Sequence, residues 1–144
     1  MYSPLYQRLG LALLRVFAAA VMMQHGVQKL FGFLGGINGQ GGTVQLMSQF
    51  GLAGILETFV ALLVLVGLFT RPAAFILAGE MAWVFFQAHF PRGFWPVQNG
   101  GETPVLLCFI FLFFAAFGAG SFSLDALLGR NAESRPAERS ITAA

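Results

Sequence analysis

The sequence predicts an all-α integral membrane protein that folds as a four-helix bundle. The first observation is composition: of 144 residues, 57% are hydrophobic and only 10% are charged, and the mean hydropathy is +0.75. A soluble domain usually carries about 25% charged residues, so this chain has too little polar material to cover a surface that faces water. The second observation is four long apolar stretches, and the third is that ionisable residues inside them follow helical spacing.

The four apolar stretches approach the roughly 20 residues that a helix needs to cross the hydrocarbon of a bilayer. We expect the spans at about residues 9–31, 51–69, 73–90 and 103–119. They form one bundle within residues 1–128, with a Gly-rich, uncharged loop at 32–49. Pro72 can begin the third helix but cannot continue the second, so a tight turn joins them. After a short surface helix at 123–128, we expect residues 129–144 to form a disordered polar tail.

Lysines and arginines near the ends of the spans predict the orientation in the membrane. Arg8, Arg71 and the arginines of the C-terminal tail fall on one side, whereas Lys29 and Arg92 fall on the other. Basic residues favour the cytoplasmic side, so we expect a multi-pass protein with both termini in the cytoplasm. The two longer loops would then lie outside.

Ionisable side chains lie inside the first three apolar stretches. They are costly in a bilayer unless they face the interior of the bundle. Arg15 and Lys29 lie about 40° apart around the first helix, and His25 and Lys29 are one turn apart on the same face. The second stretch carries Glu57 and the third carries Glu80. We therefore expect these faces to point toward one another.

Depth in the membrane predicts which of these groups meet. Arg15 and Glu80 both fall toward the cytoplasmic half, which predicts a structural ion pair that clamps the bundle. His25 and Glu57 lie at similar depth near the outer ends of their helices, and Lys29 is close by. We predict that these three residues form an outer cluster and are the candidate catalytic residues, although Lys29 could instead extend to the interface.

Other polar and aromatic residues accompany the outer cluster. On the third span, Glu80, Trp83 and Gln87 share one face by i, i+3, i+7 spacing. His89 ends that span, and Trp95 lies in the following loop. We expect Trp83, Gln87, His89 and Trp95 to contribute to cofactor binding, although an interfacial role is the simpler interpretation for His89.

Several classes of function lack their sequence signals. The single cysteine, Cys108, lies in an apolar run and cannot form an intrachain disulfide. The net charge of +2 does not indicate nucleic acid binding. No Gly-rich dinucleotide loop follows a strand, so no FAD or NAD motif is present, and we predict no metal site. His25 and His89 could in principle hold a haem between them, but we do not expect one.

Several segments of the chain carry a family resemblance. They are Leu13-Leu14-Arg15, His25–Gly32 (HGVQKLFG), residues 67–74 (GLFTRPAA), Phe94-Trp95, residues 99–102 (NGGE) and residues 118–125 (GAGSFSLD). Together they resemble the DoxX family over about residues 8–125, and the HGxxKLFG run is the most specific of them. The resemblance implies a four-helix protein of the bacterial inner (cytoplasmic) membrane that is linked to quinone-dependent redox chemistry. Related proteins form the membrane subunit of a thiosulfate:quinone oxidoreductase.

The leading hypothesis is a quinone or quinol site in a membrane oxidoreductase. His25 and Glu57 would supply hydrogen bonds and a proton. Lys29 would hold Glu57 ionised or stabilise a reduced oxygen, and Trp83 or Trp95 would wall the ring. Electrons would come from a redox partner protein. One alternative is a non-catalytic anchor, assembly factor or scaffold for such a partner. Another is a small-molecule or proton-coupled carrier, for which a homo-oligomer could be needed.

Overall fold

The computed structural model describes residues 4–133 of the chain, and among these residues it contains helices and no strand. The first span is α1 (Leu5–Phe31). The second is a continuous run of α2 (Gln49–Ile55), a π-helical turn η2 (Leu56–Val60) and α3 (Ala61–Val66). The all-α membrane bundle predicted from the sequence is confirmed.

The third span begins with α4 (Thr70–Val84) and continues through a second π-helical turn, η3 (Phe85–His89), into the 3₁₀ turn η4 (Phe90–Arg92). The short helix α5 (Pro96–Asn99) precedes the fourth apolar helix, α6 (Glu102–Phe117), and α7 (Leu124–Glu133) follows it. The first three spans are long and apolar enough to cross a membrane, whereas α6 is shorter, with 16 residues. Pro72 lies in the first turn of α4, as the tight turn required.

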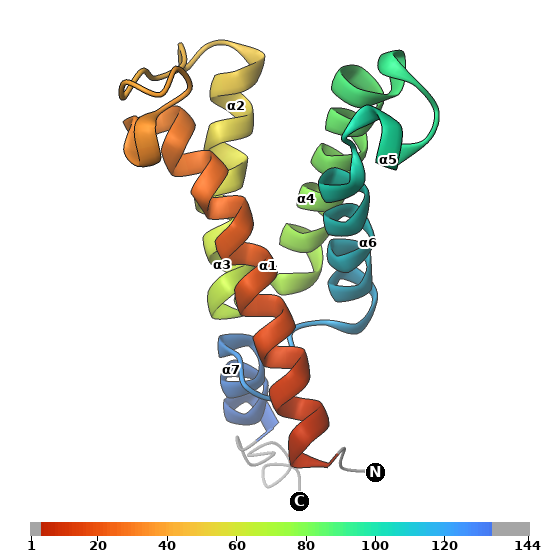
Figure 1. Ribbon diagram of the computed structural model, residues 1–144. Helices are drawn as coiled ribbons and strands as arrows, with labels where there is room; N and C mark the ends of the chain where they lie inside the picture. The colour runs from red at the N-terminus through yellow and green to blue at the C-terminus, as the bar shows by residue number, and fades with distance from the viewer. Residues whose placement is uncertain (1–3, 134–144) are drawn as a thin grey trace, which may run out of the picture.

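The helices form two pairs, which Figure 1 shows meeting at mid-height and diverging toward one end. One pair is α1 with the second span, and the other is α4 with α6. Small residues such as Ala18, Ala19 and Ala74 are buried where helices approach, and larger side chains such as Leu77 and Phe111 fill the rest of the core. Small interfacial residues allow membrane helices to pack closely without a water-driven hydrophobic effect.

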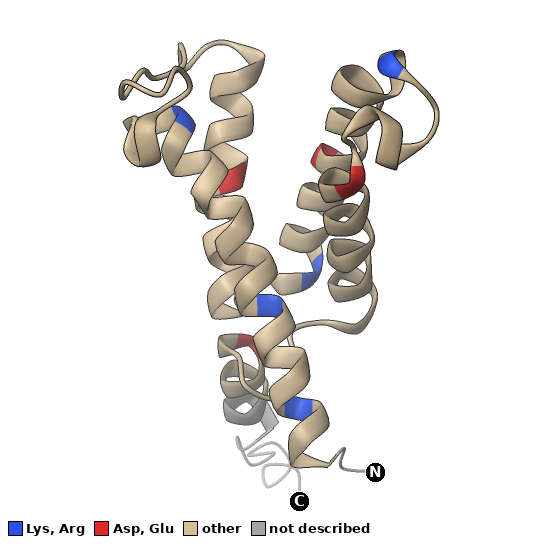
Figure 2. Ribbon diagram, in the orientation of Figure 1, with Lys and Arg blue, Asp and Glu red and all other residues tan. Residues whose placement is uncertain are grey.

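The first and last described residues lie at the same end of the bundle, where α7 packs near the start of α1 (Figure 1). Basic positions gather toward this end, and others lie near the opposite end (Figure 2). This arrangement agrees with an even number of membrane crossings. We refer below to the end that carries α7 as the inner end and to the diverging end as the outer end.

Arg15 holds the inner end together, but not through the predicted partner. Its guanidinium donates hydrogen bonds to the carbonyl oxygens of Ala119 (2.5 Å) and Phe122 (2.8 Å), in the segment between α6 and α7. The side chain is buried, with 3% of its surface exposed. The predicted Arg15–Glu80 ion pair is therefore wrong. Helix spacing and depth indicated that both groups face inward, but they could not show that a returning backbone segment would meet Arg15 first.

Asp125 and Arg71 also join segments at the inner end, and we call their contacts together with those of Arg15 the inner clasp. The Asp125 carboxylate accepts hydrogen bonds from the backbone N–H groups of Phe69 (2.8 Å) and Thr70 (3.0 Å), so it caps the start of α4. Arg71 donates to the carbonyl oxygens of Ala115 and Ala116 near the end of α6. These contacts explain the physical role of the GLFTRP and GAGSFSLD segments.

Helix boundaries differ from the predicted ones by a few residues. The first span begins at Leu5 rather than residue 9, and the second ends at Val66 because Gly67 adopts a left-handed conformation (φ +72°). The surface helix continues to Glu133, five residues into the segment predicted as a polar tail. The remainder of that predicted tail, residues 134–144, lies outside the described residues.

The Gly-rich loop after α1 is held by its own hydrogen bonds. The Asn38 side chain accepts from the backbone N–H groups of Gln40 and Gly42, and Ile37 donates to Gly42. The backbone N–H of Val44 donates to the Lys29 carbonyl oxygen at 2.9 Å. The loop is therefore tied to the last turn of α1, beside the outer cluster.

Candidate functional site

A cavity of about 520 Å³ lies toward the outer end, and all four spans contribute to its walls. It is lined by six of the seven residues predicted for the catalytic and cofactor-binding groups: His25, Lys29, Glu57, Trp83, Gln87 and His89. The seventh, Trp95, is not among the lining residues. It is 60% exposed and packs edge-on against Phe94, with ring centroids 5.1 Å apart.

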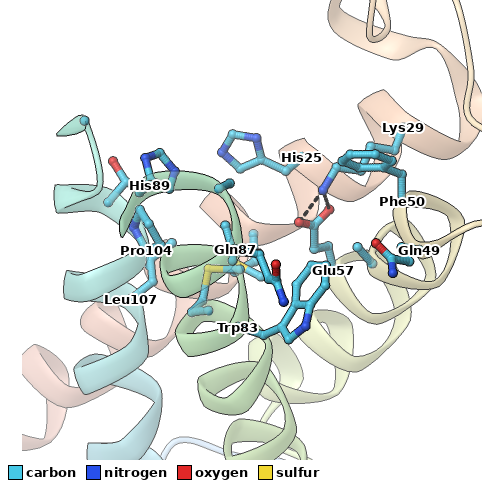
Figure 3. A pocket seen from close by; sticks show the side chains of 17 residues that line it. His25, Lys29, Gln49, Phe50, Glu57, Trp83, Gln87, His89, Pro104 and Leu107 are labelled. Atoms are coloured by element: carbon cyan, nitrogen blue, oxygen red, sulfur yellow. Dashed lines mark hydrogen bonds and ion pairs between the residues drawn. The ribbon is translucent and has the colours of Figure 1, made fainter. Parts of the chain in front are cut away.

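The ion pair between Lys29 and Glu57 is the central feature of the cavity wall (Figure 3). The Lys29 Nζ atom lies 2.6 Å from each oxygen of the Glu57 carboxylate. The Glu57 side chain is only 4% exposed, whereas that of Lys29 is 20% exposed. Lys29 is thus the more accessible member of the pair, and it does not extend to the interface as the alternative interpretation held.

Gly26 explains how the first two spans approach closely enough to form this pair. A Cβ atom on Gly26 would overlap the Thr58 side chain and would lie 2.6 Å from the Thr58 backbone nitrogen. Only glycine lets α1 pass this close to the π turn. Lys29, three residues further along α1, is thereby brought within reach of Glu57, the residue before Thr58. The HGxxK pattern therefore encodes a helix crossing as well as two ionisable side chains that line the cavity.

The second and third spans, which both line the cavity, each contain a π-helical turn. The turn η2 includes Glu57, and the turn η3 includes Gln87 and His89. A π turn inserts one residue into a helix and redirects the side chains that follow, and such turns are frequent at functional sites. Neither turn was predicted from the sequence, because a single inserted residue barely changes the periodicity of an apolar stretch.

His25 lines the cavity beside Lys29 and Glu57, but it forms no hydrogen bond with the Glu57 carboxylate. Among the described residues, its ring has no hydrogen-bond partner, and Lys29 takes both Glu57 oxygens instead. The His25 side chain is exposed and lines the cavity. Gln87 likewise lines the cavity and has no hydrogen-bond partner in the described part of the chain. These two side chains are free to bind a ligand.

His89 is fixed by the loop that covers the outer end of the third span. Its Nδ1 atom lies 3.1 Å from the Asn99 carbonyl oxygen and 3.4 Å from Arg92 Nη2. The buried Asn99 amide in turn donates to the Gly93 carbonyl oxygen and accepts from the backbone N–H of Gly101. His89 thus lines the cavity from a rigid support, and its other ring nitrogen carries no hydrogen bond within the described residues.

Glu80 lies at a second, more apolar groove of about 430 Å³ between the second and third spans. The groove and the cavity share Gln49, Ala53 and Trp83. Glu80 is 9% exposed, and neither oxygen of its carboxyl group has a hydrogen-bond partner among residues 4–133. It is therefore next to the site rather than part of a structural clamp.

Sequence reasoning missed Gln49 and Phe50, which line the cavity from the start of the second span. Their signal was present in part, because Phe50, Ala53 and Glu57 follow i, i+3, i+7 spacing and so share one helical face. No group of three or more His, Cys, Asp or Glu side chains that could hold a metal ion occurs in the described residues. The arrangement offers one cation, a carboxylate bound to it, two imidazoles and two amides around an otherwise apolar space.

Comparisons with known proteins agree with the resemblance drawn from the sequence. The family model described as DoxX matches residues 10–90, which contain most of the first three spans and most of the cavity-lining residues. An uncharacterized protein of Haemophilus influenzae is 40% identical over 126 residues, covering 83% of this chain and 91% of the relative. No solved structure matches the chain. The chain belongs to the DoxX family.

Proposed function

We propose that the cavity binds the head group of a membrane quinone or quinol, and that the protein is the membrane component of an oxidoreductase. We place it in the bacterial inner membrane with the inner end of the bundle in the cytoplasm. The observation that carries the proposal is the Lys29–Glu57 pair on the wall of a cavity enclosed by all four spans. Around it, His25 and Gln87 are free to bind a ligand.

The size and lining of the cavity fit such a head group. Small-molecule sites usually measure about 300–1,000 Å³ and combine apolar walls with a few polar groups, as this cavity does. Met22, Met81 and Leu107 supply apolar surface, and the Trp83 ring can lie against a flat ligand. The adjoining groove, with walls such as Leu52 and Leu56, offers an apolar path for a hydrocarbon tail.

The polar residues supply what the oxygens of a quinone need. The Lys29 ammonium has three N–H donors, of which two suffice for the Glu57 oxygens, so one can be directed to a ligand oxygen. The Glu57 carboxylate lies against the Lys29 ammonium and compensates its charge inside the bundle. His25, Gln87 and the free ring nitrogen of His89 can donate to the other oxygen. When bound, a quinone supplies two-electron, two-proton redox chemistry, and we assign the delivery of electrons to a partner protein.

Tryptophan fluorescence can test the proposal directly. The chain contains two tryptophans, so the Trp95→Phe variant reports from Trp83 alone, on the wall of the cavity. In nanodiscs, we expect decylubiquinone to quench this fluorescence saturably. Lys29→Met should weaken binding about 10-fold or more, since a hydrogen bond to a charged group contributes about 1.5–3 kcal/mol. Glu102→Gln, an exposed carboxylate outside the cavity lining, is the matched control and should bind normally.

Two results would contradict the proposal. One is quenching of Trp83 that rises linearly with quinone and is unchanged in the Lys29→Met variant. The other is the absence of quinone in lipid extracts of the protein purified from native membranes. Co-purification of a soluble redox enzyme without quinone would instead favour an anchor, assembly factor or scaffold. Quinone-independent, proton-driven uptake of a solute would favour a carrier, with oligomerisation then to be examined.

A further inference from the structure

Glu80 is a buried carboxyl group that the fold leaves without a partner. Its two oxygens are inaccessible to solvent and accept no hydrogen bond from any described residue, although the predicted partner Arg15 is buried in the same bundle. An unpaired ionised carboxylate in such a place costs several kcal/mol, whereas the protonated acid avoids most of that cost. The position of Glu80 therefore requires an explanation other than structural pairing.

The charges around Glu80 already balance without it. Lys29 on α1 and Glu57 on the second span act on Glu80 electrostatically, and their charges cancel as an ion pair. From α6, which also packs against α4, the titratable groups are the exposed Glu102 at the first residue and the thiol of Cys108. An ionised Glu80 would give the buried site a net negative charge. Charge balance thus favours one cation, one anion and one neutral acid.

We infer that Glu80 is the proton-holding acid of the site: it keeps its proton in the resting protein and gives it to a cavity ligand whose oxygen becomes negatively charged. The inference deepens the proposed function and, for the donation step, rests on it. The geometry supports a route for the proton from Glu80 to the cavity, because the groove at Glu80 and the cavity share Gln49 and Trp83. The Gln49 amide has no partner among the described residues, and the groove has room for water that can bridge polar groups.

The proton balance of the step is simple. Two electrons reach the ligand from the partner protein. The O–H bond of Glu80 breaks as an O–H bond forms on one ligand oxygen, which leaves Glu80 as a carboxylate. The second proton enters through His25, which lines the cavity and is exposed. Glu80 then takes a proton from solution and returns to its neutral form.

Infrared spectroscopy of the full chain in nanodiscs tests both parts of the inference. A protonated carboxylic acid has a carbonyl stretch that is separate from carboxylate bands and shifts in D₂O. The resting spectrum should lose one such band in Glu80→Gln, keep it in Glu80→Asp, and lose only carboxylate bands in the Glu102→Gln control. An electrode can then supply the electrons that we assign to the partner protein. In time-resolved spectra, reduction of bound decylubiquinone should bleach the acid band in the wild type and in Glu102→Gln until Glu80 takes up a proton from solution.

The Glu80→Gln variant keeps the shape of the side chain, so its elution profile and its affinity for decylubiquinone should stay within about 3-fold of the wild type. A carboxylate band at Glu80 in the resting protein would overturn the inference. Binding of quinone with an acid band that stays unchanged throughout the reduction would overturn the donation step alone. Absence of binding in the Trp83 assay would refute both that step and the proposed function.

Discussion

Removing the ammonium group of Lys29 should destabilise the protein more than removing the whole ion pair. Lys29→Met keeps most of the apolar stem but leaves the Glu57 carboxylate, only 4% exposed, without its partner 2.6 Å away. Breaking a buried pair on one side costs about 3–5 kcal/mol. Because Lys29 is 20% exposed and water reaches the pair, we expect the lower end of this range, about 3 kcal/mol.

The double variant Lys29→Met/Glu57→Gln removes both charges and should recover most of the lost stability. The free energy of unfolding is measured by titration with SDS in mixed micelles, with helical circular dichroism as the signal. The double-mutant cycle should give a coupling energy of about 2 kcal/mol or more, because the two groups are in contact. The loss in Lys29→Met should also shrink as the pH falls, since a proton on Glu57 removes the uncompensated charge. A single variant as stable as the wild type, or a double variant no better than the single, would refute this account.

Three further substitutions test the contacts that position the site. Gly26→Ala should lower the free energy of unfolding by about 1–3 kcal/mol, because the new methyl group must displace the backbone at Thr58. Normal stability of this variant in the same SDS titration would show that the two spans do not approach so closely. Arg15→Met should lower the free energy of unfolding by about 2 kcal/mol or more, because two hydrogen bonds to backbone carbonyls are lost. It should also increase proteolysis between α6 and α7, and an unchanged cleavage pattern would argue against the inner clasp. Asp125→Ala should lower the free energy of unfolding by about 1 kcal/mol by removing the cap at Thr70, and Asp125→Asn should recover part of that stability. Equal stability of the wild type and both variants would exclude the cap.

The fold class was predictable because the constraint that sets it is strong. A bilayer core has no water to satisfy the backbone, so apolar stretches of this length must be helical. The residues that line the cavity were also largely predictable, since ionisable groups in membrane spans must face the bundle interior and helical spacing assigns them to faces. His25, Lys29 and Glu57 were grouped correctly for this reason. The sequence did not decide whether Lys29 pairs with Glu57 or faces a ligand, because that choice requires side-chain distances.

The inner clasp shows what depth and periodicity cannot provide. Arg15 was correctly placed facing inward, but its partners are backbone carbonyls of Ala119 and Phe122, and a carbonyl carries no signal in the sequence. The segment that supplies them follows the last span and returns beneath the bundle. Its position depends on the cap that Asp125 provides to α4. The two π turns escaped prediction similarly, because each depends on a one-residue register change inside an apolar helix.

The most direct test of the central claim is to map where a photoreactive quinone attaches. A short-chain azido-quinone is photolysed with the full chain in nanodiscs, and the labelled peptides are identified by mass spectrometry. Binding in the cavity predicts labels on residues 22–29 of α1 and 81–89 of the third span, both suppressed by excess decylubiquinone. Labels confined to lipid-facing positions of α6 such as Phe109 and Phe117, without competition, would contradict a quinone site in this cavity.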